Sequence, residues 1–286
     1  MLRYRLLLGP VLIAALVLVL WAEERLTAAG WPRGAVLLAV MALVGALAAR
    51  ELARILREKN IGASTGLTIA SAMLGLAACG WAPGRVRGDL LAALVGSAAV
   101  IVLLASVGYY SRRRNPQGAI ASAGGALLAF VYLGLMFGFV AAIRREHSAW
   151  LVLYVLLVVK ASDTGAYFAG RAFGRRKLIA WLSPGKTWEG LVGGILLASL
   201  AGWLGLAAMR EWLPGERLPP AWSGALAGAL GAVVGQMGDL VMSLFKRDAG
   251  RKDSGHSLPG FGGVLDVLDS PLLVAPLAYW WLVLAS

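Results

Sequence analysis

Apolar segments of about 20 residues recur along the whole chain, separated by short polar segments. The runs cover residues 6–22, 34–49, 65–82, 90–110, 119–143, 149–169, 189–209, 221–244 and 265–285. A helix needs roughly 20 apolar residues to cross the hydrocarbon core of a bilayer. Inside the bilayer each backbone polar group must be satisfied within its own segment, which selects helices over open strands. The pattern therefore predicts an all-α, polytopic integral membrane protein with about nine transmembrane helices.

The first apolar run has features of a signal peptide. It follows Arg3 and Arg5, but at residues 6–22 it is long for the apolar region of such a peptide. Glu23 and Glu24 follow the run in place of a clear small-residue cleavage site. We therefore expect an uncleaved first span.

The distribution of basic residues predicts how the chain is oriented. The polar segments between the nine runs are numbered as loops one to eight along the chain. The N-terminal segment and the even-numbered loops hold 18 of the 27 Lys and Arg residues, and the odd-numbered loops with the C-terminus hold 8. Only Lys160 lies within an expected span. Basic residues accumulate on the cytoplasmic side of membrane proteins. This predicts a cytoplasmic N-terminus, an external C-terminus, and cytoplasmic loops at 170–188 and 245–264.

Composition agrees with a membrane protein and argues against other classes. The chain is 59% hydrophobic and 15% charged, whereas soluble domains carry roughly 25% charged residues. The net charge of +12 is explained by topology and anionic lipid headgroups, and no basic-aromatic module points to nucleic acid. Cys79 is the single cysteine, which argues against disulfides, cysteine zinc sites and thiol chemistry.

The segment 236–270 concentrates charge and glycine between two apolar runs. Charges beside a membrane span are costly unless they pair, reach water or bind an ion, so such a concentration indicates a functional site. Asp239, Ser243, Lys246 and Arg247 share one helical face by their spacing. An acid, a hydroxyl and two cations on one face favour a phosphate and metal assembly. The alternative for the two bases is a salt-bridged helix end with snorkelling side chains.

The glycine-rich part of this segment suggests a phosphate-binding loop. Gly262 and Gly263 permit close backbone approach, which exposes N–H groups to phosphate oxygens. Lys252 and Asp253 precede them in the same loop. A simple turn is the alternative, and His256 is interpreted as a loop residue and not as a general base.

Two acids stand at the head of the last apolar run. Asp266 and Asp269 are spaced i, i+3, so their carboxylates can face one site. Mg²⁺ takes one or two carboxylates plus substrate phosphates and water. The alternative is capping of the helix N-terminus, above all by Asp269.

A second polar constellation occupies residues 160–194. Asp163 is an acid near a span end, and Ser183, Lys186 and Thr187 surround a Ser-Pro-Gly turn ahead of a helix. Arg175 belongs to a basic run suited to a triphosphate or a lipid phosphate, or simply to a positive-inside loop. Ser183 with Lys186 lacks the supporting groups of a Ser-Lys nucleophile pair.

These motifs resemble one known family. The run GDLVMSLFKRDAGRKDSGHSLPGFGGVLDVLDS resembles the signature of phosphatidate cytidylyltransferases, also called CDP-diacylglycerol synthases. SDTGAYFAGRAFG and SPGKTWEGLVGG resemble the conserved region that precedes it. The resemblance covers roughly 160–275. Two positions depart from the family pattern, because Phe261 and Val267 stand where histidine and arginine are common.

The resemblance implies an enzyme of the cell inner membrane that transfers CMP from CTP to phosphatidate and releases pyrophosphate. Its active site would face the cytoplasm, its cofactor would be Mg²⁺ with a second cation left open, and it would form a homodimer. Residues 1–148 would supply N-terminal spans and 149–286 the catalytic region. The residues assigned to catalysis are Asp239, Lys246, Arg247, Lys252, Asp253 and Asp266. Those assigned to substrates are Ser183, Lys186, Thr187, Arg175, Ser243, Gly262 and Gly263, and those assigned to metal are Asp239, Asp266, Asp269 and Asp163.

Two other functions remain open from the residues alone. A related isoprenoid-lipid cytidylyltransferase or lipid kinase would use the same ion chemistry on another substrate. A secondary transporter would place its binding groups near the bilayer midplane at a repeat interface. The charged motif residues cluster instead at the expected cytoplasmic span ends, and no repeat is visible.

Overall fold

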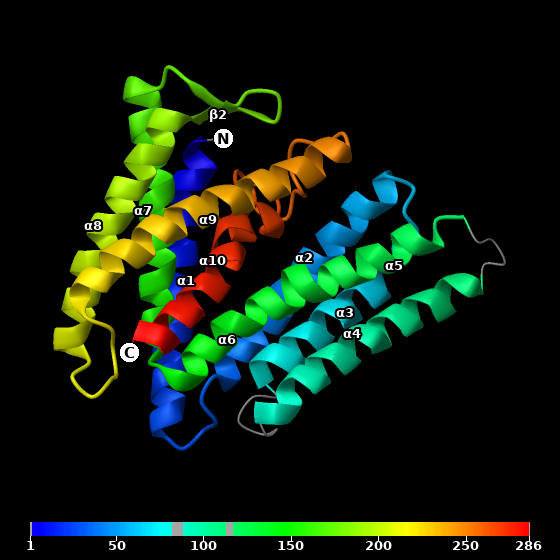
Figure 1. Cartoon of the computed structure of the whole chain (residues 1–286), viewed down its shortest axis with the longest axis horizontal. Helices are drawn as coiled ribbons and strands as arrows, with labels where there is room; N and C mark the ends of the chain where they lie inside the picture. The colour runs from blue at the N-terminus through cyan, green and yellow to red at the C-terminus, as the bar shows by residue number, and fades with distance from the viewer. Residues whose placement is uncertain (1, 82–87, 113–116, 286) are drawn as a thin grey trace. The chain divides into compact units, whose positions relative to one another are not determined.

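The computed structural model describes residues 2–81, 88–112 and 117–285, and helices dominate it (Figure 1). By packing, the chain divides into two compact units. The first comprises Met1–Ala142 and Phe245–Val267, and the second comprises Ile143–Leu244 and Leu268–Ser286. The predicted division into residues 1–148 and 149–286 is a functional one and stays a prediction.

The N-terminal part of the chain forms helices at each apolar run predicted there. They are α1 (Leu2–Ala28), α2 (Ala35–Glu58), α3 (Thr65–Leu76) with the π-helical η1 (Ala77–Trp81), α4 (Gly88–Ser111), α5 (Ala119–Leu128) with the π-helical η2 (Ala129–Leu135), and α6 (Met136–Glu146). Close packing of α3 on η2 depends on glycine. A Cβ at Gly75 would lie 2.9 Å from Gly134 Cα, so the two backbones meet without a side chain between them.

The start of α2 is capped by a buried acid from α1. Glu23 is almost fully buried, and its carboxylate accepts the backbone N–H groups of Gly34, Val36 and Leu37 at 2.5–3.1 Å. The first N–H groups of a helix have no partner within the helix, and a negative charge there is favourable. Glu23 therefore fixes where α2 begins.

The C-terminal part contains the remaining four long helices and one hairpin. The elements are α7 (Ala149–Phe173), β1 (Lys177–Ile179), β2 (Ser183–Thr187), α8 (Trp188–Trp212), α9 (Ala221–Asp248) and α10 (Val264–Ala285). Within the second unit α7 packs along α8 (Figure 1). A Cβ at Gly224 would lie 2.9 Å from the carbonyl carbon of Gly202, and one at Gly228 would lie 2.7 Å from that of Ala198. Glycine at these two positions of α9 therefore lets α8 and α9 approach closely.

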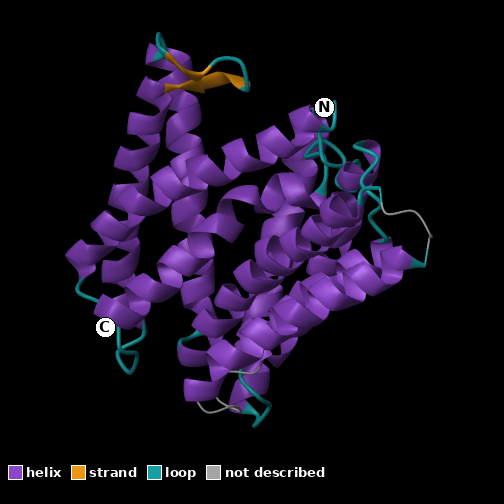
Figure 2. Cartoon of the chain, turned by 45° about the vertical axis from the view of Figure 1, so that its right-hand side comes forward, coloured by secondary structure: helices purple, strands orange, loops and turns teal. Residues whose placement is uncertain are grey.

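The hairpin β1–β2 was not predicted, because residues 170–188 were expected to be a loop. The two strands are antiparallel, with Lys177 opposite Thr187 and Ile179 opposite Ser183 (Figure 2, orange). The hairpin leads directly into α8, where the Thr187 hydroxyl accepts the N–H of Gly190 at 3.0 Å. Pro and Gly are depleted in strands, so the Ser-Pro-Gly sequence of β2 carried no strand signal.

The helices support a multi-pass membrane protein. Seven are long and apolar enough to cross a bilayer: Ala35–Glu58, Leu90–Ser111, Ala119–Glu146, Ala149–Phe173, Trp188–Trp212, Ala221–Asp248 and Val264–Ala285. The helix Thr65–Trp81 is shorter, and α1 is not among the seven over its described residues. The count of nine and the orientation stay predictions. One boundary is corrected, since α2 continues to Glu58 beyond the run expected to end at residue 49.

Candidate active site

The glycine-rich segment begins where α9 ends in a left-handed glycine cap. Gly250 has φ +70°, its N–H donates to Arg247 O at 3.0 Å, and the N–H of Arg251 donates to Lys246 O at 2.7 Å. This is a Schellman cap, which satisfies the last carbonyls of a helix. It turns the chain into the loop between α9 and α10 and leaves Lys246 in the last turn of α9.

A tight turn closes the loop before α10. The N–H of Phe261 donates to Leu258 O at 3.0 Å, and Leu258 pairs with Gly262 in an antiparallel bridge. Pro259 and Gly260 occupy the central positions, and Gly260 has φ +84°. Proline followed by a glycine at positive φ is the pattern of a type II turn.

Asp266 is the centre of this loop. Its Oδ1 lies 2.5 Å from Lys246 Nζ, and its Oδ2 accepts the N–H and the hydroxyl of Ser254 and the N–H of Gly263, each at 2.9 Å. The side chains of Asp266 and Lys246 are only 9% and 14% exposed. An acid in the first turn that accepts the N–H just before its helix acts as a cap. The capping role expected above all for Asp269 thus belongs to Asp266.

Glu51 on α2 holds the other side of the loop. It is 3% exposed. Its Oε1 accepts the Ser257 hydroxyl at 2.6 Å and the Val264 N–H at 3.0 Å, while Oε2 accepts the Ser254 hydroxyl and the Leu265 N–H at 3.0 Å each. Glu51 was not predicted, because the apolar run was expected to end before it. The sequence does contain one signal for it. Glu51 adjoins an expected span, and no basic residue lies three or four positions before it, on the side of that span.

Other predicted residues of this loop and of the end of α9 lie at the surface. Arg247, Lys252 and Asp253 are exposed, as is His256. Gly262 has φ +94°, a conformation that favours glycine. The carboxylates of Glu51 and Asp266 fix the loop backbone. Exposed basic residues on and beside such a loop suit contacts with a large anionic ligand.

The two departures from the family pattern have different surroundings. Phe261 is half-buried, and the end of its ring lies 3.9 Å from the place where Gly9 of α1 would carry a Cβ. An apolar ring suits this packed position better than a histidine. Val267 is half-buried on α10, and nothing in the structure explains the loss of an arginine there.

The second unit contains another acid and lysine pair. Lys186 on β2 lies 2.8 Å from Asp239 Oδ2 on α9, and its Nζ also donates to Gln236 O at 3.4 Å. The lysine side chain is 17% exposed and the aspartate 41%. The hairpin, which places Lys186 one residue before the cap of α8, brings together two residues that the sequence assigned to phosphate and to metal.

The remaining predicted residues of the second unit lie in different surroundings. Asp163 pairs with Lys160 on α7 at 2.9 Å, and both are exposed. Arg175 is exposed at the hairpin, whereas Thr187 is buried and uses its hydroxyl as the cap of α8. Asp269 is buried, and its Oδ1 accepts the N–H of the next residue at 2.7 Å. Ser183 and Ser243 are half-buried on β2 and α9.

The carboxylates differ in how well they fit a divalent cation. Over residues 2–81, 88–112 and 117–285, no three His, Cys, Asp or Glu side chains gather as a metal-binding group. Mg²⁺ needs only one or two carboxylates when phosphates and water complete its shell. Asp239 fits this best, because it is partly exposed. Both oxygens of Asp266 already accept protein donors, so it would have to release Lys246 to hold a metal.

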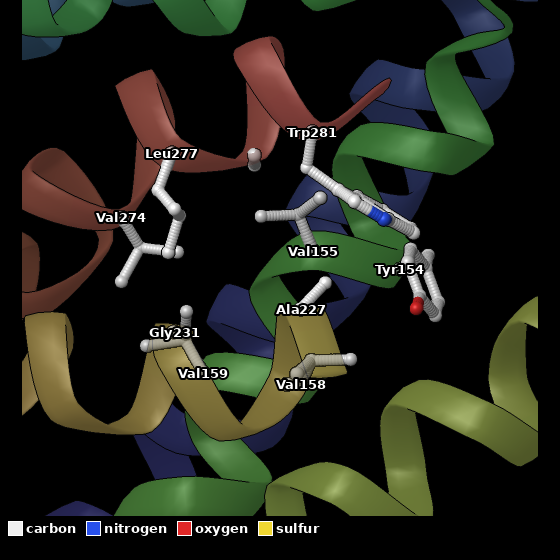
Figure 3. A pocket seen from close by; sticks show the side chains of 11 residues that line it. Tyr154, Val155, Val158, Val159, Ala227, Gly231, Val274, Leu277 and Trp281 are labelled. Atoms are coloured by element: carbon white, nitrogen blue, oxygen red, sulfur yellow. The ribbon is translucent and has the colours of Figure 1, made fainter. Parts of the chain in front are cut away.

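The second unit also has a small cavity that is not a candidate active site. It lies between α7, α9 and α10 and is lined by Tyr154, Val158, Gly231, Val274 and Leu277 among others (Figure 3). The Tyr154 hydroxyl donates to the backbone oxygen of Gly202 at 2.8 Å. Apart from this hydroxyl and the indole N–H of Trp281, which donates to Ser223 Oγ at 3.3 Å, the lining is apolar, so it offers no group for acid, base or phosphate chemistry.

The loop leaves no room for a side chain at Gly263. A Cβ there would lie 2.8 Å from Glu51 Cδ and closer still to Ser254 Oγ. Overpacking of this kind costs about 1–3 kcal/mol. We expect Gly263→Ala to lower the midpoint of thermal unfolding in detergent. Gly108→Ala, at a helical position with open space around it, is the control and should not lower it. An unchanged midpoint for Gly263→Ala would contradict the described loop.

Comparison with known proteins finds several that are similar to parts of this chain. Three bacterial proteins named phosphatidate cytidylyltransferase are similar to parts of the chain. The protein of Haemophilus influenzae is 42% identical over 130 residues (46% of this chain, 44% of the relative). That of Bacillus subtilis is 40% identical over 161 residues (56% and 58%), and that of Pseudomonas aeruginosa is 44% identical over 126 residues (44% and 45%). The chain thus spans about half the length of the curated relatives it matches.

The match to a family profile is much longer than these pairwise matches. The profile of the cytidylyltransferase family matches residues 3–285, which include both acid and lysine pairs and Glu51. Because the match covers nearly the whole sequence, the chain belongs to the cytidylyltransferase family.

Proposed function

We propose that this protein is a phosphatidate cytidylyltransferase of the cell inner membrane, with its active site facing the cytoplasm. A phosphate oxygen of phosphatidate attacks the α-phosphorus of CTP and forms a new P–O bond. The bond from the α-phosphorus to the oxygen shared with the β-phosphate breaks, and that oxygen leaves with pyrophosphate. The products are CDP-diacylglycerol and pyrophosphate, and no covalent protein intermediate is needed.

One observation carries the proposal. Two acids assigned to metal each form an ion pair with a lysine assigned to phosphate, at 2.8 Å for Lys186 with Asp239 and 2.5 Å for Lys246 with Asp266. Both substrates are anions, so the main obstacle to reaction is charge repulsion. Cations that can turn from a carboxylate to a phosphate reduce that repulsion and position the reacting groups.

We assign the other basic residues by their exposure and charge. The exposed Arg247 and Lys252 contact phosphates together with Lys186 and Lys246, with Arg175 as a further basic residue. The N–H groups of Gly262 and Gly263 donate to Leu258 O and to Asp266 Oδ2, so these two glycines shape the loop and their N–H groups are not assigned to phosphate.

We also propose Mg²⁺ as cofactor, with Asp239 as the protein ligand whose exposure fits best and with Asp266, Asp269 and Asp163 as further candidates. When bound, the ion would neutralise charge on the leaving pyrophosphate. A homodimer is part of the proposal on the basis of the family resemblance.

Incubation of the purified full-length protein with labelled CTP, Mg²⁺ and phosphatidate tests the function. We expect CDP-diacylglycerol and pyrophosphate in equal amounts. We expect chelation by EDTA to abolish the reaction and added Mg²⁺ to restore it. Product formed from ATP, or only from polyprenol phosphates, would contradict the proposal in favour of a kinase or an isoprenoid-lipid enzyme.

A further inference from the structure

Glu51 is a buried acid to which the proposed mechanism assigns no role. It lies on α2, more than 200 residues before the segment that it contacts. All four donors to its carboxylate come from residues 254–265, which form the loop and the first turn of α10. With three donors of its own and a fourth, the Ser254 hydroxyl, shared with Asp266, Glu51 suits a supporting role better than contact with a substrate.

Ser254 connects Glu51 with Asp266. Its Oγ lies 3.0 Å from Glu51 Oε2 and 2.9 Å from Asp266 Oδ2, and its N–H donates to the same Asp266 oxygen. The hydroxyl has one proton and donates to one carboxylate at a time. Movement of Ser254 would therefore disturb the group that orients Asp266, and Asp266 in turn holds Lys246 at 2.5 Å.

Glycines bring these groups within reach of one another. A Cβ at Gly255 would lie 2.7 Å from Glu51 Oε1, and a Cβ at Gly262 would lie 2.6 Å from Asp266 Oδ2. The loop backbone is therefore packed directly against both carboxylates, and each carboxylate limits where the loop can lie.

We propose that Glu51 is a positioning residue for CMP transfer, acting through Ser254 and the first N–H groups of α10. It keeps the loop in the arrangement in which Asp266 and Lys246 meet. The proposal rests on the proposed function, and it gives the N-terminal half of the chain a part in catalysis beyond spanning the membrane.

Glu23 provides a matched control for this role. It is also a buried acid of the first unit, and it also accepts N–H groups at a helix start, that of α2. Neither α1 nor α2 carries a residue assigned to the reaction. If Glu51 served only as a helix cap, its replacement should therefore change kcat no more than the replacement of Glu23 does.

The experiment compares Glu51→Gln, Glu51→Asp and Glu23→Gln in purified full-length protein. We expect Glu51→Gln to lower kcat on the order of tenfold or more, with a smaller change in KM for CTP. Glu51→Asp should recover part of the loss. Glu23→Gln should lower thermal stability but keep kcat within about threefold of wild type. Trypsin should cleave after Arg251 or Lys252 faster in Glu51→Gln than in Glu23→Gln.

A double-mutant cycle tests whether Glu51 acts through Ser254. If it does, Glu51→Gln combined with Ser254→Ala should lower kcat by clearly less than the product of the two single effects. Glu23→Gln with Ser254→Ala should follow that product. Ser257→Ala removes a single donor to Glu51 and should give a milder loss of kcat, which keeps the test open if Glu51→Gln does not fold.

Each outcome bears on one proposal. Inactive wild type with CTP and phosphatidate would overturn the proposed function. Active wild type with an unchanged kcat in folded Glu51→Gln, or with an equal loss in Glu23→Gln, would overturn the role of Glu51 alone. If Glu51→Gln does not fold, an unchanged kcat in Ser257→Ala would overturn that role.

Discussion

Asp266→Asn is expected to lower the rate of CMP transfer on the order of 10²-fold or more. One oxygen of the Asp266 carboxylate accepts the N–H groups of Ser254 and Gly263 and shares the Ser254 hydroxyl with Glu51, and the other oxygen holds the Lys246 ammonium. An asparagine removes the charge. Its NH₂ group would then face either Lys246 or the donors from Ser254 and Gly263. Loss of one partner of a largely buried ion pair costs about 3–5 kcal/mol, and the loop that carries the assigned cations would shift.

The measurement is the initial rate of CDP-diacylglycerol formation from labelled CTP, together with the thermal unfolding midpoint. Asp248→Asn is the matched control, because Asp248 is an exposed aspartate at the end of α9 that pairs with Lys59 at 3.1 Å. An exposed pair is worth about 0–1 kcal/mol, so this variant should retain activity. A rate near wild type for Asp266→Asn, or an equal loss for Asp248→Asn, would refute the assignment of Asp266.

The pair of Lys186 and Asp239 is expected to respond to single changes with similarly large losses. Lys186→Met removes a cation that the mechanism assigns to a phosphate, and Asp239→Asn removes the acid assigned to the metal. Loss of one such electrostatic contact typically lowers kcat on the order of 10²–10³-fold. The charge swap Lys186→Asp with Asp239→Lys should not restore activity, because each group has its own ligand.

The swap distinguishes chemistry from stability. A pair that served only to hold β2 against α9 would be re-formed in part by exchanging the charges, and activity would return. Glu216→Gln is the control within the second unit, since Glu216 lies 3.4 Å from His147 Nδ1 and has no assigned role. Recovery of most activity in the swapped protein would exclude the proposed division of roles between Lys186 and Asp239.

The helices were largely predictable, because length and hydropathy are local properties. Each predicted apolar run coincides with helix in the described residues, and seven of these helices meet the length and composition expected of a span. The end of α2 was not predictable in this way. Its apolar run stops near residue 49, but the following Arg, Glu, Leu and Ala are good helix formers, so the helix continues to Glu58.

The residues of the candidate site were named from the sequence and stay a prediction, whereas their contacts were not predictable. Asp239, Lys186, Lys246 and Asp266 were named from their types and spacing, and the structure pairs them as two acids with two lysines. The partner of each was not predictable, since Lys186 and Asp239 are 53 positions apart and their approach depends on a hairpin with no strand signal.

The apolar runs and the residue types were thus sufficient to predict a helical membrane protein. They also identified a charged, glycine-rich segment that resembles a family signature. Both features depend on short stretches of chain, because hydropathy and backbone freedom are local properties. The role of Glu51 came only from packing. A carboxylate becomes a cap when folding brings N–H groups without partners to it, and those groups lie more than 200 residues further along the chain.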